Sequence, residues 1–232
     1  MLIAITGGIG SGKSVVSQLL RVMGFRVYDC DARAKWVMTH DALLRQQLIE
    51  LFGPDTYLPA VQDGVDLPAV PDGTCQPAGH DEDAVPTLNK SYLSSQIFGH
   101  PEALAKMNAC VHPAVGRDLM QQYHANLSIP SPPSNPSNSS PLPFFFESAI
   151  LFESAFDRIV HPDCIWTVSA PLELRIERAM SRDHASREQV LARIASQMTQ
   201  EEKEKRSDAV IMNDTEHSVT RQVWELVDKG VS

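Results

Sequence analysis

The sequence predicts an α/β protein whose core is a five-stranded, parallel, doubly wound sheet. Three observations predict this fold class. Short apolar runs recur along the chain at lengths typical of buried parallel strands. Segments with helical periodicity separate these runs, which favours right-handed βαβ connections. A glycine-rich turn and a helix directly follow the first run, as in a βαβ unit.

The first half of the chain predicts one βαβ unit followed by a helical subdomain. The unit comprises a strand over Leu2–Ile5, a helix over Ser14–Met23 and a strand over Phe25–Tyr28. Helical periodicity then covers Ala32–Phe52, Ser91–Phe98, Pro101–Val111 and, after His112-Pro113, a stretch to about His124. The segment 58–87 is rich in Pro, Asp and Gly, so we expect an irregular insertion there.

The second half of the chain supplies the other three strands. They are predicted at Phe144–Phe146, Cys164–Val168 and Ala209–Met212. Helices are expected over 172–181, from 186 to about 198, from 199 onward for a short stretch, and over 218–228. The second and third of these helices begin with the capping-box patterns Ser186-x-x-Gln189 and Thr199-x-x-Glu202. Residues 127–143 are rich in Ser and Pro, which is typical of a linker loop.

Composition restricts the possible functions. The formal net charge of -9 argues against a nucleic-acid-binding surface. The cysteines are scattered without a C-x-x-C pair, which argues against a zinc site or disulfide framework and favours reduced thiols. No apolar run reaches the ~18 residues of a membrane span, and no secretory signal is recognisable. We therefore expect a cytoplasmic protein with no membrane contact, and we infer no obligatory protein partner.

The most informative motif is Gly7–Ser14, which matches the pattern G-x-x-x-x-G-K-[ST] of a phosphate-binding loop. Its glycines allow positive φ angles and a close approach of the backbone to phosphates. Successive amides then form an anion-binding nest at the positive end of a helix. Lys13 is expected to reach the β- and γ-phosphates, and the Ser14 hydroxyl to coordinate Mg²⁺.

Two aspartates follow the second predicted strand. In extended backbone, Asp29 and Asp31 share one face and Cys30 points away. A carboxylate there can accept the proton of an attacking hydroxyl, whereas the alternative role is that of a turn former or helix cap. We favour catalysis for Asp31, and both interpretations stay open for Asp29.

Arginines recur at helical spacing in the second half of the chain. Arg175, Arg178 and Arg182 lie three and four residues apart, and Arg193 follows in the next predicted helix. This spacing favours a movable lid that closes on a triphosphate, because guanidinium groups stabilise the charge of phosphoryl transfer. The alternative is an ordinary solvated helix face with local ion pairs.

Several strings together resemble the dephospho-coenzyme A kinases of the P-loop kinase superfamily. The strings are LIAITGGIGSGKS, VYDCD, LNKSYLSSQIF…LAKMNACVHP, FFFESAILFES, RAMSRD…ARIASQ and DAVIMND. They cover nearly all of the chain apart from the two low-complexity segments. The resemblance implies a P-loop kinase fold with three parts. These are a nucleotide-binding core over 1–31 and 143–232, a helical lid over about 178–207, and a helical acceptor (CoA-binding) subdomain over 32–126.

The resemblance also implies an activity and residue roles. ATP, with Mg²⁺, would phosphorylate the ribose 3′-hydroxyl of dephospho-coenzyme A, the last step of coenzyme A biosynthesis. The implied catalytic residues are Asp31 as base, Lys13 and Arg178. The implied ATP contacts are Gly8, Ile9, Gly10, Ser11, Gly12, Lys13, Ser14, Val15, Arg182 and Asn213. The implied acceptor contacts are Asp31, Asn108, His112, Pro113 and Glu153, while Arg193 and Gln197 match the lid helix.

The chain departs from the family pattern by its two Pro-rich insertions, the first of which falls in the acceptor subdomain, and at three further places. Cys30 stands where Ala is usual, Lys35 stands where Arg or His is frequent, and the segment 149–153 lacks the proline of P-L-L-x-E. His112 also fits a simple packing or capping role. The second hypothesis is another small-molecule kinase of the same fold, acting on a nucleoside or nucleotide. A non-catalytic nucleotide-dependent switch is the third possibility, but it leaves Asp31 and the arginines without a use.

Overall fold

The computed structural model describes residues 1–58, 86–128 and 142–231. Contacts within the chain divide it into two compact units, one formed by Met1–Ala34 with His112–Ser232 and the other by Lys35–Val111. The interiors of the predicted insertion over 58–87 and of the predicted linker over 127–143 lie outside the described residues.

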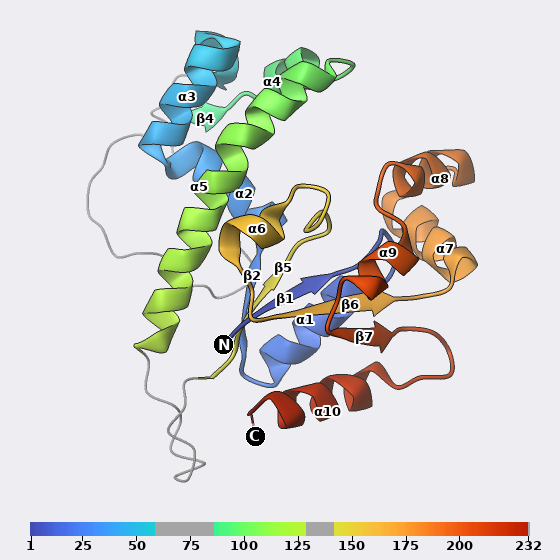
Figure 1. The fold of residues 1–232 in the computed structure, drawn as a ribbon. Coiled ribbons are helices and arrows are strands. Elements are labelled where there is room, and N and C mark those ends of the chain that lie inside the picture. Colours follow the sequence, from blue (N-terminus) through green and yellow to red (C-terminus); the bar gives the residue numbers. More distant parts are fainter. Residues whose placement is uncertain (59–85, 129–141, 232) are drawn as a thin grey trace. The chain divides into compact units, whose positions relative to one another are not determined.

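The larger unit is built on a five-stranded sheet with the strand order β2-β5-β1-β6-β7 (Figure 1). The strands are β1 (Leu2–Thr6), β2 (Arg26–Asp29), β5 (Phe144–Glu147), β6 (Cys164–Ser169) and β7 (Ala209–Met212). Every pair of neighbouring strands is parallel. The predicted five-stranded parallel sheet is therefore confirmed, and the carboxyl ends of its strands meet at one edge, where ligands of such sheets bind.

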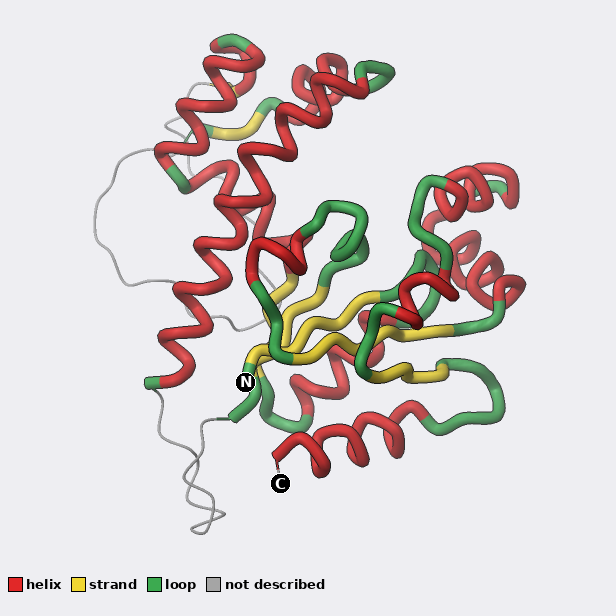
Figure 2. The backbone as a smooth tube through the Cα atoms, in the orientation of Figure 1, coloured by secondary structure: helices red, strands yellow, loops and turns green. Residues whose placement is uncertain are grey.

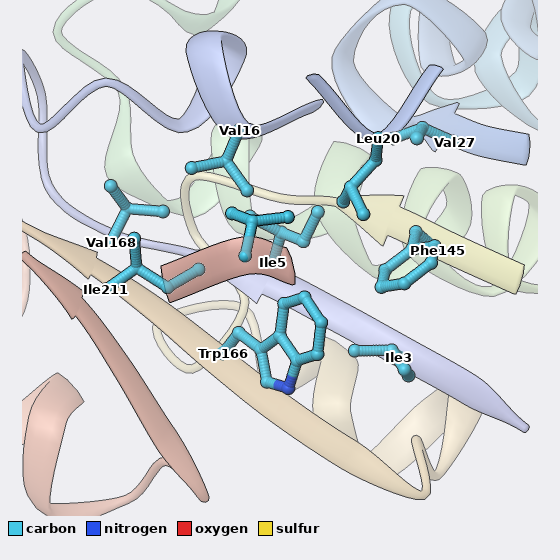
Figure 3. Close-up of a cluster of buried hydrophobic side chains, with 10 residues drawn as sticks. Ile3, Ile5, Val16, Leu20, Val27, Phe145, Trp166, Val168 and Ile211 are labelled. Carbon is cyan, nitrogen blue, oxygen red and sulfur yellow. The ribbon is translucent and has the colours of Figure 1, made fainter. Parts of the chain in front are cut away.

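Helices cover the sheet and close its core. Helices α1 (Lys13–Val22) and α10 (Val219–Val231) lie side by side on one face of the sheet (Figures 1 and 2). Their apolar side chains form one cluster with those of the central strands. Figure 3 shows Leu20, Phe145 and Trp166 in this cluster, all of them buried. The remaining helices of this unit after β5 are α6 (Phe156–Val160), α7 (Leu172–Asp183), α8 (Arg187–Ala195) and α9 (Gln200–Lys205).

The smaller unit is mainly helical. Helix α2 (Cys30–His40) enters it from the larger unit, and α5 (Pro101–Leu127) leaves it. Between them lie α3 (Ala42–Phe52), η1 (Pro54–Thr56), the strands β3 (Tyr57–Leu58) and β4 (Thr87–Leu88), and α4 (Lys90–Ile97). The two short strands form an antiparallel pair that the sequence patterns did not predict.

Two predicted helix boundaries are wrong. The helical pattern over 32–52 is interrupted at Asp41, whose carboxylate accepts a hydrogen bond from the Leu44 amide at 2.9 Å and starts α3. Conversely, α5 continues through Pro113, although a proline inside a helix removes one backbone hydrogen bond. Apolar side chains beyond the proline, including Val115 and Leu119, are buried and stabilise the uninterrupted helix.

Removing the Phe145 ring should test the importance of the sheet core. Phe145 is 0% exposed and contacts Phe25 and Trp166. We expect Phe145→Ala to lower the free energy of unfolding by about 3–5 kcal/mol in urea denaturation, because the core cannot fill the cavity. Phe98→Ala is the matched control, since Phe98 is 88% exposed, and it should change stability by less than about 0.5 kcal/mol. Equal losses in both variants would contradict this core assignment.

Candidate active site

The phosphate-binding loop lies between the carboxyl end of β1 and the first turn of α1, as predicted. Gly7, Gly10 and Gly12 have φ angles of 151°, 75° and 97°. Only glycine adopts such angles readily, so these positions require it. The amides of Lys13 and Ser14 open α1 and lie at the positive end of the helix dipole. The loop therefore presents N–H groups at the sheet edge where ligands bind.

The carbonyl groups of the loop are held by side chains. Lys13 Nζ donates to the carbonyl oxygens of Gly7 at 3.0 Å and Gly8 at 3.3 Å. Arg175 Nε donates to the Ile9 carbonyl at 3.0 Å. Asn213 Nδ2 donates to the Ser11 carbonyl at 2.8 Å. These bonds direct the loop carbonyls toward protein donors, which leaves the helix-opening amides to face an anion.

Lys13 lies among charges of both signs. Burial lowers the pKa of its ammonium group to about 8, an effect that Lys203 and Arg182 increase and that Glu147 and Asp31 oppose. Glu147, at the end of β5, accepts a hydrogen bond from Ser17 Oγ at 2.6 Å. Burial raises the pKa of the Glu147 carboxyl. Lys13 is therefore within electrostatic range of two carboxylates, those of Glu147 and Asp31.

The structure separates the roles of the two aspartates after β2. Asp29 Oδ1 accepts a hydrogen bond from the Ala32 amide at 2.9 Å, so Asp29 caps α2. The helix begins at Cys30, and Asp31 lies in its exposed first turn. The expectation that both carboxylates share one face of an extended strand is therefore wrong, because the cap starts a helix immediately. Cys30 is buried, which raises the pKa of its thiol.

The arginines of α7 have different surroundings. Arg175 is only 6% exposed and lies against the phosphate-binding loop. Arg178 donates to the Asn213 carbonyl at 3.0 Å and is half-buried beside the same loop. Arg182 is exposed and pairs with Asp183, the carboxylate that Arg193 also contacts. The α7–α8 segment thus carries both a buried contact to the loop and solvent-exposed guanidinium groups.

Apart from Asp31 on α2, the residues expected to contact the acceptor lie in two places. Asn108, His112 and Pro113 are on α5, and burial lowers the pKa of His112. Glu153 Oε1 pairs with Lys203 Nζ at 2.7 Å and accepts a hydrogen bond from the Met198 amide at 3.0 Å. The Glu153 carboxylate therefore holds both the segment before α9 and Lys203 on α9.

The other predicted residues lie on α1 and α2, and the segment 197–203 adds side chains that the sequence motifs did not indicate. Ser14 and Val15 are exposed in the first turn of α1, and Lys35 is exposed on α2. The loop amides also donate to Gln197, which the sequence matched only to the lid, and to Gln200, which it did not single out. Lys203, likewise not singled out, donates to a carbonyl after β5. No local pattern indicates these contacts, because the partners are far apart in sequence.

None of the helices within residues 1–58, 86–128 and 142–231 has the length and apolarity to cross a membrane. No group of three or more His, Cys, Asp or Glu side chains in this part of the chain is arranged to hold a metal ion.

Known proteins identify the family. A family model described as dephospho-CoA kinase matches residues 1–64 and 81–218. A dephospho-CoA kinase from Bacteroides fragilis is 38% identical over 228 residues, covering 97% of this chain and 90% of the relative. The Porphyromonas gingivalis dephospho-CoA kinase is 33% identical over 230 residues, covering 97% and 92%.

Solved structures agree with the fold. A crystal structure from Thermus thermophilus has a TM-score of 0.71 and 30% identity, covering 100% of this chain and 98% of that one. The dephospho-CoA kinase from Campylobacter jejuni shares the fold, with a TM-score of 0.57 at 22% identity over 100% and 96%. The chain belongs to the dephospho-CoA kinase family.

Proposed function

We propose that this chain transfers the γ-phosphoryl group of ATP to the ribose 3′-hydroxyl of dephospho-CoA, using the site at the carboxyl edge of the sheet. The observation that carries the proposal is the loop itself. Its carbonyls are bonded to Lys13, Arg175 and Asn213. The first amides of α1 lie at the positive end of the helix dipole, where a phosphate binds favourably. A family member with such a loop has the parts that phosphoryl transfer requires.

In this proposal Lys13 and the loop Gly8–Val15 surround the ATP phosphates. The phosphate donors are among the amides after Ile9, because the Gly8 and Ile9 amides are bonded to side chains of the segment 197–200. Arg178 and Arg182, on successive turns of α7, stabilise the negative charge of the transferred group when the helical lid of about 178–207 closes. Asn213, which lies next to Gly12, is a proposed contact near the adenine of ATP. Closure excludes water, which otherwise competes as the acceptor.

Asp31 is the proposed general base. It lies in the first turn of α2, exposed, and within electrostatic range of Lys13. Its carboxylate would accept the proton that leaves the ribose hydroxyl as the new P–O bond forms and ADP departs. Asp29 is less suited to this role, because its carboxylate caps α2.

The residues near the loop fit a magnesium ion. Mg²⁺ prefers oxygen ligands and is usually held by one or two protein groups together with substrate phosphates. The exposed Ser14 hydroxyl and the Glu147 carboxylate, which lies near Lys13, are such oxygen donors. When bound, the ion would supply charge neutralisation on the phosphate oxygens.

We also propose functions for the remaining parts. Asn108, His112 and Pro113 on α5, and Glu153 after β5, are the proposed acceptor contacts. A cytoplasmic location suits the chain, because the free thiols of Cys30, Cys110 and Cys164 persist in a reducing compartment.

A panel of acceptors with labelled ATP should test the reaction. We expect acceptor-dependent ADP release and label on dephospho-CoA, and no label on nucleosides or nucleoside monophosphates. Label on a nucleoside monophosphate but not on dephospho-CoA would replace the proposal with another small-molecule kinase. Tight nucleotide binding with no acceptor-dependent ADP release would instead indicate a non-catalytic switch.

Asp31→Asn should separate chemistry from nucleotide binding. We expect kcat to fall at least ~10²-fold, because the amide cannot accept a proton, while the Kd for ADP stays within about twofold. Rapid-quench kinetics and calorimetry measure the two quantities. Asp55→Asn, which changes an exposed carboxylate of η1, is the control. An unchanged kcat in Asp31→Asn would remove this residue from the mechanism.

Nucleotide affinity should depend on the protonation of Lys13. The pKa of about 8 in the free protein must rise when phosphates surround the ammonium group. Above pH 8 binding therefore requires proton uptake, and the Kd for ADP should rise by up to about tenfold per pH unit. Calorimetry between pH 7.5 and 9.5 measures this dependence.

Lys13→Arg is the control for this pH dependence, because its guanidinium stays charged throughout the range. Its affinity for ADP should stay nearly constant with pH, whatever its absolute value. If both proteins lose affinity in parallel, Lys13 is not the titrating group.

A further inference from the structure

We propose that Arg175, Gln197 and Gln200 are positioning residues that hold the phosphate-binding loop through Gly8 and Ile9. Gln200 Oε1 accepts a hydrogen bond from the Gly8 amide at 3.3 Å. Gln197 Oε1 accepts one from the Ile9 amide at 3.0 Å. Arg175 Nε donates to the Ile9 carbonyl at 3.0 Å. Three side chains from the segment after β6 thus engage consecutive backbone groups at the start of the loop.

Ile9 is fixed at three points. Its amide and carbonyl bind Gln197 and Arg175, and its side chain packs against the small apolar cluster that joins α7 to α8. That cluster is formed by Ile176, Ala179 and Val190. An isoleucine in a glycine-rich loop therefore works as an anchor, which limits rotation of the peptide planes on either side of it.

Packing of α7 on the loop also accounts for two of its glycines. A Cβ atom at Gly10 would overlap the backbone carbonyl of Arg175, which cannot move without shifting α7. A Cβ atom at Gly8 would overlap the Arg175 guanidinium, which lies at the end of a flexible side chain. A side chain at position 8 therefore displaces the guanidinium from the Ile9 carbonyl rather than strain the backbone.

The contact couples two parts of the proposed site. Arg178 and Arg182 follow Arg175 on the same helix, so the bond to Ile9 positions the start of that helix, ahead of the lid, relative to the phosphate-binding amides. Gln200 also donates to the Val168 carbonyl at 3.5 Å and to Glu204 at 3.3 Å, so its own amide group is fixed. Hydrogen bonds that fix a positioning side chain in this way also keep the loop amides and the arginines in a constant geometry.

Methionine variants remove the hydrogen-bonding groups at similar side-chain size. We expect Gln197→Met, Gln200→Met and Arg175→Met each to raise the Kd for ADP and the KM for ATP about 3- to 10-fold, as for one lost hydrogen bond. The KM for dephospho-CoA should stay within about twofold. Gln189→Met is the matched control, because Gln189 Oε1 accepts a similar bond from the Ser186 amide within the cap of α8.

Hydrogen exchange distinguishes positioning of the loop from general stability. In the three variants, exchange should become faster in a peptide containing Gly8 and Ile9 and should stay unchanged in peptides from β6 and β7. Equal acceleration in the sheet peptides would show a merely structural role and overturn the proposal. Unchanged nucleotide affinity and unchanged loop exchange would overturn it as well.

A double-mutant cycle tests the Gly8–Arg175 relation directly. Gly8→Ala should weaken ADP binding to about the same extent as Arg175→Ala, because it displaces the guanidinium. In the Arg175→Ala background, Gly8→Ala should cause no further loss beyond about twofold. Losses that multiply in the double variant would contradict the proposed contact, whereas activity of the unmodified enzyme tests the reaction independently.

Discussion

The phosphate-binding loop can present its amides to an anion only while its carbonyl groups are hydrogen-bonded elsewhere. A free loop would turn carbonyl oxygens toward the phosphates as readily as amides, and the two dipoles would cancel. Here the carbonyls of Gly7, Gly8, Ile9 and Ser11 each accept a hydrogen bond from a protein side chain. The anion-binding nest is therefore a property of its surroundings as well as of the glycine pattern.

The sheet order explains how those surroundings converge. Strand β1 is central, with β5 and β6 as its neighbours, so the loop leaves the sheet between Glu147 on one side and Ser169 on the other. Strand β7 lies beyond β6 and ends immediately before Asn213, the residue that binds the loop and Arg178. Residues that are distant in the chain thus meet because parallel strands end at one edge.

The sequence predicted the elements better than the contacts between them. Continuous apolar runs such as Phe144–Phe146 identify strands buried on both faces, and the capping boxes at Ser186 and Thr199 identify helix starts. Both signals depend on near neighbours. The role of Asp29 as a helix cap depends on the chain turning into a helix at Cys30 instead of staying extended. The spacing of the two aspartates does not distinguish these backbone conformations. The hydrogen bond that the Ile9 amide donates to Gln197 joins residues 188 positions apart, so no local pattern reveals it.

The cations around the loop have to be held in place despite their mutual repulsion. Lys203 is 0% exposed and lies close enough to lower the pKa of Lys13, as Arg182 does. A buried ammonium group is tolerated only when it is paired and fully hydrogen-bonded. Glu153 supplies the paired charge at 2.7 Å, and the Ala149 carbonyl accepts a further bond at 3.0 Å. The pair ties α9 to the segment after β5, and α9 begins with Gln200, which binds the loop. The protein has a net negative charge, yet it holds several cations near the carboxyl edge of the sheet. Hydrogen bonds and ion pairs to specific partners keep these cations in place.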